Sequence, residues 1–156
     1  MAWMMNRHFS EILSELSVAG VEYLVVGAFA VAAHGNPRAT GDIDIWIRPT
    51  RENAERVLVA LRAFGAPLYE LSVDDLTDEQ TVFQIGVAPM RIDILAGIDG
   101  VTFEDAWPRR VIAKLGASNV SVLSLFDLAA NKRAAGRPKD LVDLAWIEQR
   151  LKLDES

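Results

Sequence analysis

Two aspartates at alternate positions, Asp42 and Asp44, begin a run of residues that favours a β-strand. Because side chains alternate between the two faces of a strand, both carboxylates are expected on one face. Two carboxylates about 6 Å apart repel each other by about 3 kcal/mol at an effective dielectric constant near 20. An ordinary exposed strand face would leave that charge to bulk water, and a basic side chain could also neutralise it. We favour a divalent metal ion, because the apolar residues nearby make unpaired carboxylates costly.

A third carboxylate, Asp93, lies in a second predicted strand over residues 90–95. Alternation places it on the same face as Arg91, and an ion pair with this arginine is its simplest role. The opposite face of this strand is expected to enter the core with Met90, Ile92 and Ile94. If the two strands adjoin, three aspartates surround one point and form the oxygen-rich site that Mg²⁺ prefers. Such a site serves phosphoryl or nucleotidyl transfer, in which one carboxylate takes the proton of the nucleophile.

Several groups could bind a phosphate chain next to these carboxylates. Gly27 and Ala28 follow a predicted strand and open a helix, where free backbone N–H groups attract anions. This signal is weak alone, since many strands end at glycine. Arg38 and Thr40 stand in the polar loop just before Asp42, and they are assigned to the nucleotide as well.

Lys132 ends the apolar stripe of a predicted helix over residues 124–135. A lysine near the C-terminus of a helix is often an exposed side chain that the helix dipole favours. Its place on the inward stripe is as consistent with a charge partner for the aspartates and a triphosphate. Lys139 belongs to a basic cluster with Arg133 and Arg137. Most of this cluster is assigned to the solvated surface, and Lys139 is assigned to nucleotide binding.

Hydrophobic spacing and turn residues predict the elements that position these groups. Helices are expected over about residues 6–19, 28–34, 51–64, 102–107, 124–135 and 138–151, and strands over about 21–26, 42–48, 81–87, 90–95, 111–115 and 120–123. Thr50 and Gly65 are residue types that cap a helix at its two ends, and Pro138 suits a first helical position. The acidic segment 66–80 is expected to be irregular.

The length of 156 residues suits a single domain, with a core over about residues 21–123 and helices after it. A net charge of −6 argues against non-specific coating of nucleic acid, although one RNA could dock on a local basic patch. The absence of cysteine excludes disulfides and thiolate metal sites and fits a reducing cytoplasm. No apolar stretch reaches the about 18 residues of a membrane span, and residues 1–10 lack the pattern of a signal peptide. A cytoplasmic protein with no membrane partner is expected.

Taken together, these residues resemble the polymerase-beta-type nucleotidyltransferase superfamily. Its signature is a Gly-Gly or Gly-Ser after a strand, an Asp-x-Asp or Asp-x-Glu on a strand, and a later strand carboxylate. The matching positions here are Gly27-Ala28, Asp42-Ile43-Asp44 and Asp93. The chain is closer still to small AbiEii-like members, which are related to the toxins of type IV toxin–antitoxin systems. Their His-Gly-x-x-Arg-x-Thr-x-Asp-x-Asp run and their lysine followed by Arg-x-Lys-Asp-x-x-Asp are matched by residues 34–44, Lys132 and residues 137–143.

The resemblance implies an α/β (α+β) protein with a minimal nucleotidyltransferase fold, a mixed β-sheet flanked by helices with a helical C-terminal part. It implies that Asp42 and Asp44 bind Mg²⁺ or Mn²⁺, and that Asp93 completes the site and helps to activate the acceptor hydroxyl. The nucleoside triphosphate would be bound by Gly27, Ala28, Arg38, Thr40, Lys132 and Lys139. Ala28 departs from the Gly or Ser of the family, and its methyl group adds bulk where the phosphate approaches.

Three functions remain open on the sequence. The leading hypothesis is a Mg²⁺-dependent nucleotidyltransferase that moves an NMP from an NTP to a hydroxyl of RNA or protein. It would work in a toxin–antitoxin or phage-defence pair, with a cognate toxin or antitoxin protein as partner. The second hypothesis is a nucleotidyltransferase-like module that binds nucleotide or a partner without turnover, because Ala28 departs from the family pattern. The third is a two-metal hydrolase that uses the same carboxylates on a phosphoester.

Overall fold

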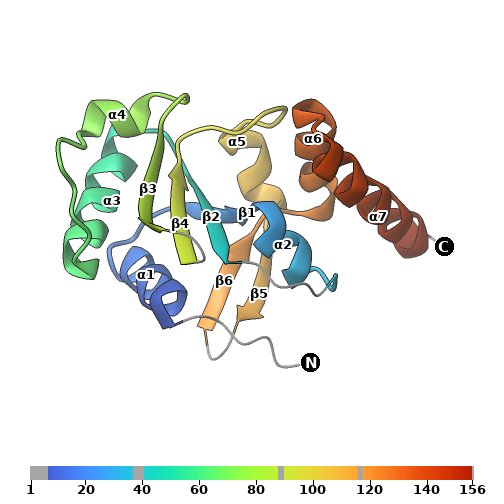
Figure 1. The fold of residues 1–156 in the computed structure, drawn as a ribbon, viewed down its shortest axis with the longest axis horizontal. Coiled ribbons are helices and arrows are strands. Elements are labelled where there is room, and N and C mark those ends of the chain that lie inside the picture. The colour runs from blue at the N-terminus through green and yellow to red at the C-terminus, as the bar shows by residue number, and fades with distance from the viewer. Residues whose placement is uncertain (1–6, 37–40, 88–89, 116–117, 156) are drawn as a thin grey trace.

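The computed structural model describes residues 7–36, 41–87, 90–115 and 118–155, and its centre is a six-stranded sheet. The strands are β1 (Tyr23–Val26), β2 (Asp42–Ile47), β3 (Val82–Val87), β4 (Met90–Leu95), β5 (Val111–Leu115) and β6 (Ser118–Val122). They lie in the order β3-β4-β2-β1-β6-β5, and Figure 1 shows them in the middle of the molecule. β2 and β4 are parallel, as are β1 and β6, whereas the other neighbouring strands are antiparallel. The sheet is therefore mixed.

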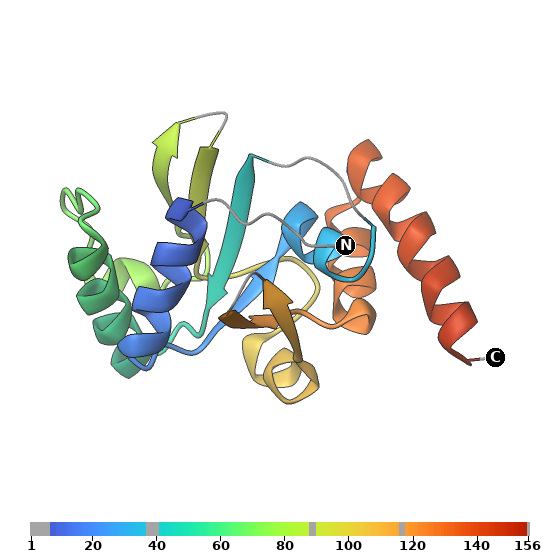
Figure 2. The same ribbon diagram turned by 90° about the horizontal axis from the view of Figure 1, so that it is seen from below.

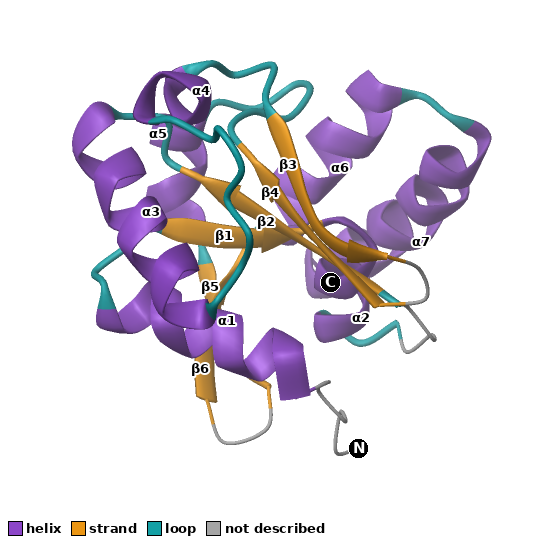
Figure 3. Cartoon of the chain, turned by 60° about the vertical axis from the view of Figure 1, so that its left-hand side comes forward, coloured by secondary structure: helices purple, strands orange, loops and turns teal. Residues whose placement is uncertain are grey.

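The longer helices form two groups at opposite ends of the molecule. One group contains α1 (Arg7–Val18), α3 (Arg51–Phe64) and the short α4 (Val73–Thr77), and the other contains α6 (Leu125–Ala135) and α7 (Pro138–Glu155). Figure 2 and Figure 3 show the strands running between these two groups. The short helix α2 (Gly27–Ala33) follows β1 directly, and α5 (Phe103–Ala106) continues into a 3₁₀ turn over Trp107–Arg109.

The ends of α3 show how local sequence sets the helix boundaries. The Thr50 hydroxyl accepts a hydrogen bond from the backbone N–H of Asn53 at 3.3 Å, which satisfies a donor in the first turn. Gly65 ends the helix in the left-handed conformation with a φ of 90°, which glycine adopts without a steric penalty. The buried stripe of α3 packs toward α1 and the core with Ala54, Val57, Leu58 and Leu61.

The predicted fold class, a mixed sheet flanked by helices with a helical C-terminal part, is confirmed. Three details are wrong. Residues 66–80 are not wholly irregular, because Ser72 and Asp75 form a reciprocal capping box that starts α4. Met90 is 47% exposed, because it pairs with Val87 at the end of the outer hairpin rather than in the middle of the sheet. Finally, α7 continues to Glu155.

Within the described ranges, no helix is both long enough and apolar enough to cross a membrane. The longest helix, α7, carries both acidic and basic side chains along its length.

Candidate functional site

The parallel pairing of β2 with β4 brings the predicted carboxylates together. Asp44 lies directly opposite Asp93 in the register, and Asp42 lies opposite Arg91. Asp93 is buried and Asp44 is half-buried beside it. The pKa of Asp44 is raised to about 6, and burial is the largest cause. The charge of Asp93, a hydrogen bond between the Asp44 and Asp93 side chains, and the charge of Asp42 raise it further. Negative charge is thus concentrated at this point of the sheet.

Arg91 lies among these carboxylates. Its Nη2 is 3.3 Å from Asp42 Oδ2, and its Nε is 3.3 Å from Asp93 Oδ1. The second contact lacks hydrogen-bond geometry, so Arg91 Nε and Asp93 Oδ1 are both buried without a hydrogen-bond partner. Within the described ranges, no three acidic or histidine side chains converge closely enough to hold a metal ion as they stand. The strands place the three aspartates near one another, but Arg91 engages Asp42 and Asp93.

Gly27 stands at the junction of β1 and α2, and its missing side chain makes room for Asp44. Its φ is +70°, and a Cβ atom at this position would overlap the Asp44 carboxylate. The residue before the helix, Val26, makes no side-chain hydrogen bond to the first turn. The first-turn N–H groups of Gly27 and Ala28, which are the donors that the sequence assigns to phosphate, therefore receive no side-chain cap from Val26.

Replacing Gly27 tests this close approach, and Gly20 offers a matched control. Gly20 has a similar φ of +75°, but its nearest atom to an added Cβ is Arg56 Cδ at 4.0 Å. We expect Gly20→Ala to lose about 1–2 kcal/mol of unfolding free energy from backbone strain alone. Gly27→Ala should lose at least about 1 kcal/mol more, because Asp44 must also move. Urea unfolding of both variants measures the difference, and equal losses would contradict the packing of Gly27 against Asp44.

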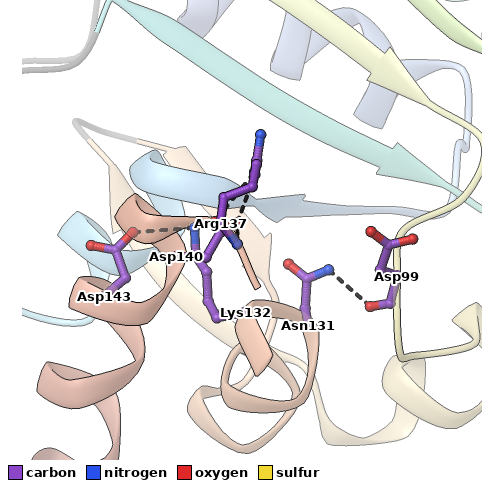
Figure 4. Close-up of polar contacts among 6 residues, drawn as sticks. All are labelled: Asp99, Asn131, Lys132, Arg137, Asp140 and Asp143. Atoms are coloured by element: carbon purple, nitrogen blue, oxygen red, sulfur yellow. Dashed lines mark hydrogen bonds and ion pairs between the residues drawn. The ribbon is translucent and has the colours of Figure 1, made fainter. Parts of the chain in front are cut away.

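Lys132 lies on the inward face of α6, as predicted, but its ammonium group is already paired. Its Nζ is 3.2 Å from Asp140 Oδ1 and 3.1 Å from Asp143 Oδ2, and its side chain is 8% exposed. Figure 4 shows this cluster, in which both aspartates come from α7. Lys132 therefore ties α6 to α7, and a contact with phosphate would require its ammonium group to leave two carboxylates.

Arg137 is a basic residue whose sequence context predicts a place on the solvated surface rather than in the site. Its Nε is 2.6 Å from Asp140 Oδ2, yet 61% of its side chain is exposed. Hydrogen bonding with Asp140 raises the pKa of Arg137, and the charges of Asp44 and Asp99 add to this effect. From its position just before α7, Arg137 therefore interacts electrostatically with carboxylates of the site. Its place in the Arg-x-Lys-Asp-x-x-Asp element is the signal that could have identified it.

A cavity of about 710 Å³ joins these groups. Among the residues predicted from sequence, its lining includes Gly27, Ala28, Asp42, Asp44, Lys132 and Lys139. Asp99, Asn131 and Arg137 line it as well, and the Asn131 side-chain amide donates to the Asp99 carbonyl oxygen at 2.9 Å (Figure 4). This hydrogen bond holds the segment after β4 against α6. Arg38 and Thr40 lie outside the described residues.

A second cavity of about 640 Å³ shares three lining residues with the first, Val82, Ile98 and Asp99. Trp46 lines this second cavity and packs edge-on against Phe103, with ring centroids 5.0 Å apart. The indole Nε1 is buried without a hydrogen-bond partner.

Comparison with known proteins supports the fold more than the activity. No protein-family model matches the chain, and no curated protein matches it. Among solved structures, it is similar to a protein from Thermotoga maritima that is provisionally named a nucleotidyltransferase, with 17% identity and a TM-score of 0.54. The match covers 97% of this chain and 94% of that one. At this level of identity the likeness shows a shared fold alone, and it supports a nucleotidyltransferase-like fold here.

Proposed function

We propose that this protein transfers a nucleoside monophosphate from a nucleoside triphosphate to a hydroxyl group of RNA or protein, with Mg²⁺ or Mn²⁺ as cofactor. The observation that carries the proposal is the register of β2 and β4, which sets Asp44 beside Asp93. Asp44 also packs against Gly27, where α2 begins. Asp42, Asp44 and the start of α2 therefore line one cavity, with Asp93 beside Asp44, and this arrangement suits a metal-bound phosphate.

The residues present fit a divalent cation. Asp93 Oδ1 is a buried carboxylate oxygen without a hydrogen-bond partner. The pKa of Asp44 is raised first by burial and then by the charge of Asp93, so a cation at this point would stabilise the ionised carboxylate. Asp42, Asp44 and Asp93 would hold the cation through oxygen atoms, which Mg²⁺ and Mn²⁺ prefer. When bound, the cation would stabilise charge on the phosphate and align the attacking and leaving oxygens.

The chain's own residues have separate roles in this proposal. The first-turn N–H groups at Gly27 and Ala28 bind phosphate oxygens, and Arg137 and Lys139 supply positive charge to the same cavity. Asp93 accepts the proton of the acceptor hydroxyl. The acceptor oxygen then forms a bond to the α-phosphorus as the bond to the leaving pyrophosphate breaks.

The family subtype also belongs to the proposal. Residues 34–44, together with Lys132 and the element over residues 137–143, support an AbiEii-like nucleotidyltransferase. A role in a toxin–antitoxin or phage-defence pair follows from that resemblance, with a cognate toxin or antitoxin protein as the partner. Whether the gene beside this one encodes a small winged-helix protein is a direct check of that pairing.

The test of the function is transfer of label from each radiolabelled NTP to total cell extract in the presence of Mg²⁺. We expect a labelled RNA or protein band with the wild-type chain and none after EDTA or in Asp42→Ala and Asp44→Ala. Nuclease and protease treatment then identify the class of acceptor. Asp74→Ala is the matched control, because the Asp74 side chain is exposed and forms an ion pair with Arg51 of α3. Transfer that survives both site substitutions would contradict the assigned carboxylates.

The alternative is a nucleotide- or partner-binding module without turnover. Two observations favour it: Ala28 carries a methyl group where the family has Gly or Ser, and Lys132 is held by two carboxylates of α7. Nucleotide binding by calorimetry without transfer from any NTP would support this alternative over the enzyme. Release of free phosphate or cleavage of an ester would instead support the hydrolase.

A further inference from the structure

Arg91 occupies an unusual position for a basic side chain next to a candidate metal site. It comes from β4, two residues before Asp93, and it lies opposite Asp42 of β2 in the register. Its guanidinium group contacts an oxygen of each, Asp42 Oδ2 and Asp93 Oδ1, at 3.3 Å. A single planar cation thus bridges two strands through two of the three aspartates assigned to the metal.

This bridge accounts for two otherwise separate observations. The first is that no three acidic side chains within the described ranges stand ready to hold a metal ion, although the strands bring Asp42, Asp44 and Asp93 together. The second is that the Arg91 Nε and Asp93 Oδ1 atoms are buried in contact without hydrogen-bond geometry. Arg91 offsets the charge of both carboxylates and donates a hydrogen bond to Asp42, but it leaves Asp93 Oδ1 without a hydrogen bond.

We infer that Arg91 is an internal counter-ion of the carboxylate site, which holds Asp42 and Asp93 in the metal-free protein and releases them when a divalent cation binds. The inference rests on the proposed function, since it assumes that these aspartates bind the metal. About a third of the Arg91 side chain, 34%, is exposed, so its guanidinium group has a route into solvent. Because cation and guanidinium compete for the same oxygens, Arg91 lowers the affinity of the site for metal.

The test is Mn²⁺ binding, measured by electron paramagnetic resonance of the free ion, in wild-type protein and in Arg91→Gln. We expect Arg91→Gln to bind Mn²⁺ about tenfold more tightly, because the competing charge is gone. Arg91→Lys keeps the charge and should bind within about threefold of wild type. Arg48→Gln is the matched control: Arg48 has a comparably buried ion pair, 3.1 Å from Glu22, and should leave Mn²⁺ affinity unchanged.

A thermal-melting measurement gives a second readout. Without metal, Arg91→Gln should melt below wild type, because the aspartates lose their counter-ion, and saturating Mn²⁺ should remove most of that difference. Unchanged or weaker Mn²⁺ binding by Arg91→Gln, with normal binding by wild type, would overturn the counter-ion role and leave the proposed function intact. Absence of Mn²⁺ binding from every variant would overturn the metal site and this inference together.

Discussion

Asp93→Asn is expected to lower the rate of nucleotidyl transfer at least about a thousandfold while leaving the protein folded. The amide has nearly the same shape, but it can neither accept the proton of the hydroxyl nor balance the charge of a divalent cation. Steady-state transfer rates at saturating NTP and Mg²⁺ measure the effect. Asp74→Asn makes the same chemical change at an exposed position of α4 and should keep the wild-type rate.

The same substitution should change how stability depends on pH. In the wild type, the pKa of Asp44 is raised to about 6 from 3.8 by burial and then by Asp93, so the folded state holds a proton that the unfolded state has lost. Stability therefore falls as pH rises from about 4 to about 6, by on the order of 1–3 kcal/mol. In Asp93→Asn the charge of Asp93 is gone, so this fall should be smaller.

Urea unfolding at pH 4.5 and pH 7.5 (roughly the two ends of that window) tests the linkage between Asp93 and Asp44. The comparison is between wild type and Asp93→Asn, which cancels the contribution of other titrating groups. If Asp93→Asn is inactive but at least as stable as wild type at neutral pH, the carboxylate pair serves function at a cost in stability. Transfer within about tenfold of wild type would contradict the assignment of Asp93.

Helix capping and strand alternation, which depend on neighbouring residues, correctly predicted helix ends and the side chains that share a strand face. Thr50 and Gly65 bound α3 as their residue types indicate, because capping depends on a few neighbouring residues. Strand alternation placed Arg91 and Asp93 on one face, and the two are in contact. The three aspartates could meet only if β2 and β4 adjoin, which the sequence alone does not establish. The two strands do pair with each other.

Contacts between distant elements could not be predicted in the same way. Helical spacing put Lys132 on an inward stripe, but the partner it meets depends on how α7 packs against α6. Asp140 and Asp143 stand in the first turns of α7, where the helix dipole alone would favour them, yet both are buried against Lys132. Likewise, the pairing of Asp42 with Arg91 follows from strand register, which neither sequence segment specifies by itself.

Asp140→Ala is expected to lower the free energy of unfolding by about 3 kcal/mol, the lower end for a broken buried ion pair. The side chain of Asp140 is fully buried and pairs with both Lys132 and Arg137. Its removal leaves the Lys132 ammonium group buried with Asp143 as its remaining partner in this cluster. Asp74→Ala, which breaks an exposed pair with Arg51, should cost no more than about 0.5 kcal/mol.

The loss of unfolding free energy in Asp140→Ala should also depend on pH. Burial alone would raise its pKa, but hydrogen bonds from Arg137 and Lys132 outweigh this and hold the pKa at about 2, below the 3.8 of the unfolded chain. The stabilisation is therefore present above about pH 4 and is lost as pH falls toward about 2. Urea unfolding followed by tryptophan fluorescence, with Trp146 on α7 as a probe, should show the variant converging on wild type in acid.

Lys132 decides whether this cluster serves stability, catalysis or both. If its ammonium group stays between Asp140 and Asp143, Lys132→Met should lower unfolding free energy but leave the KM for NTP unchanged where the variant is folded. If Lys132 instead turns to the phosphates, the same variant should raise KM or lower kcat by about tenfold or more. We expect the first result, because leaving two carboxylates for a phosphate exchanges one set of charge-assisted contacts for another at no clear gain. Arg137→Gln, at an exposed side chain on the same cavity, should show the second.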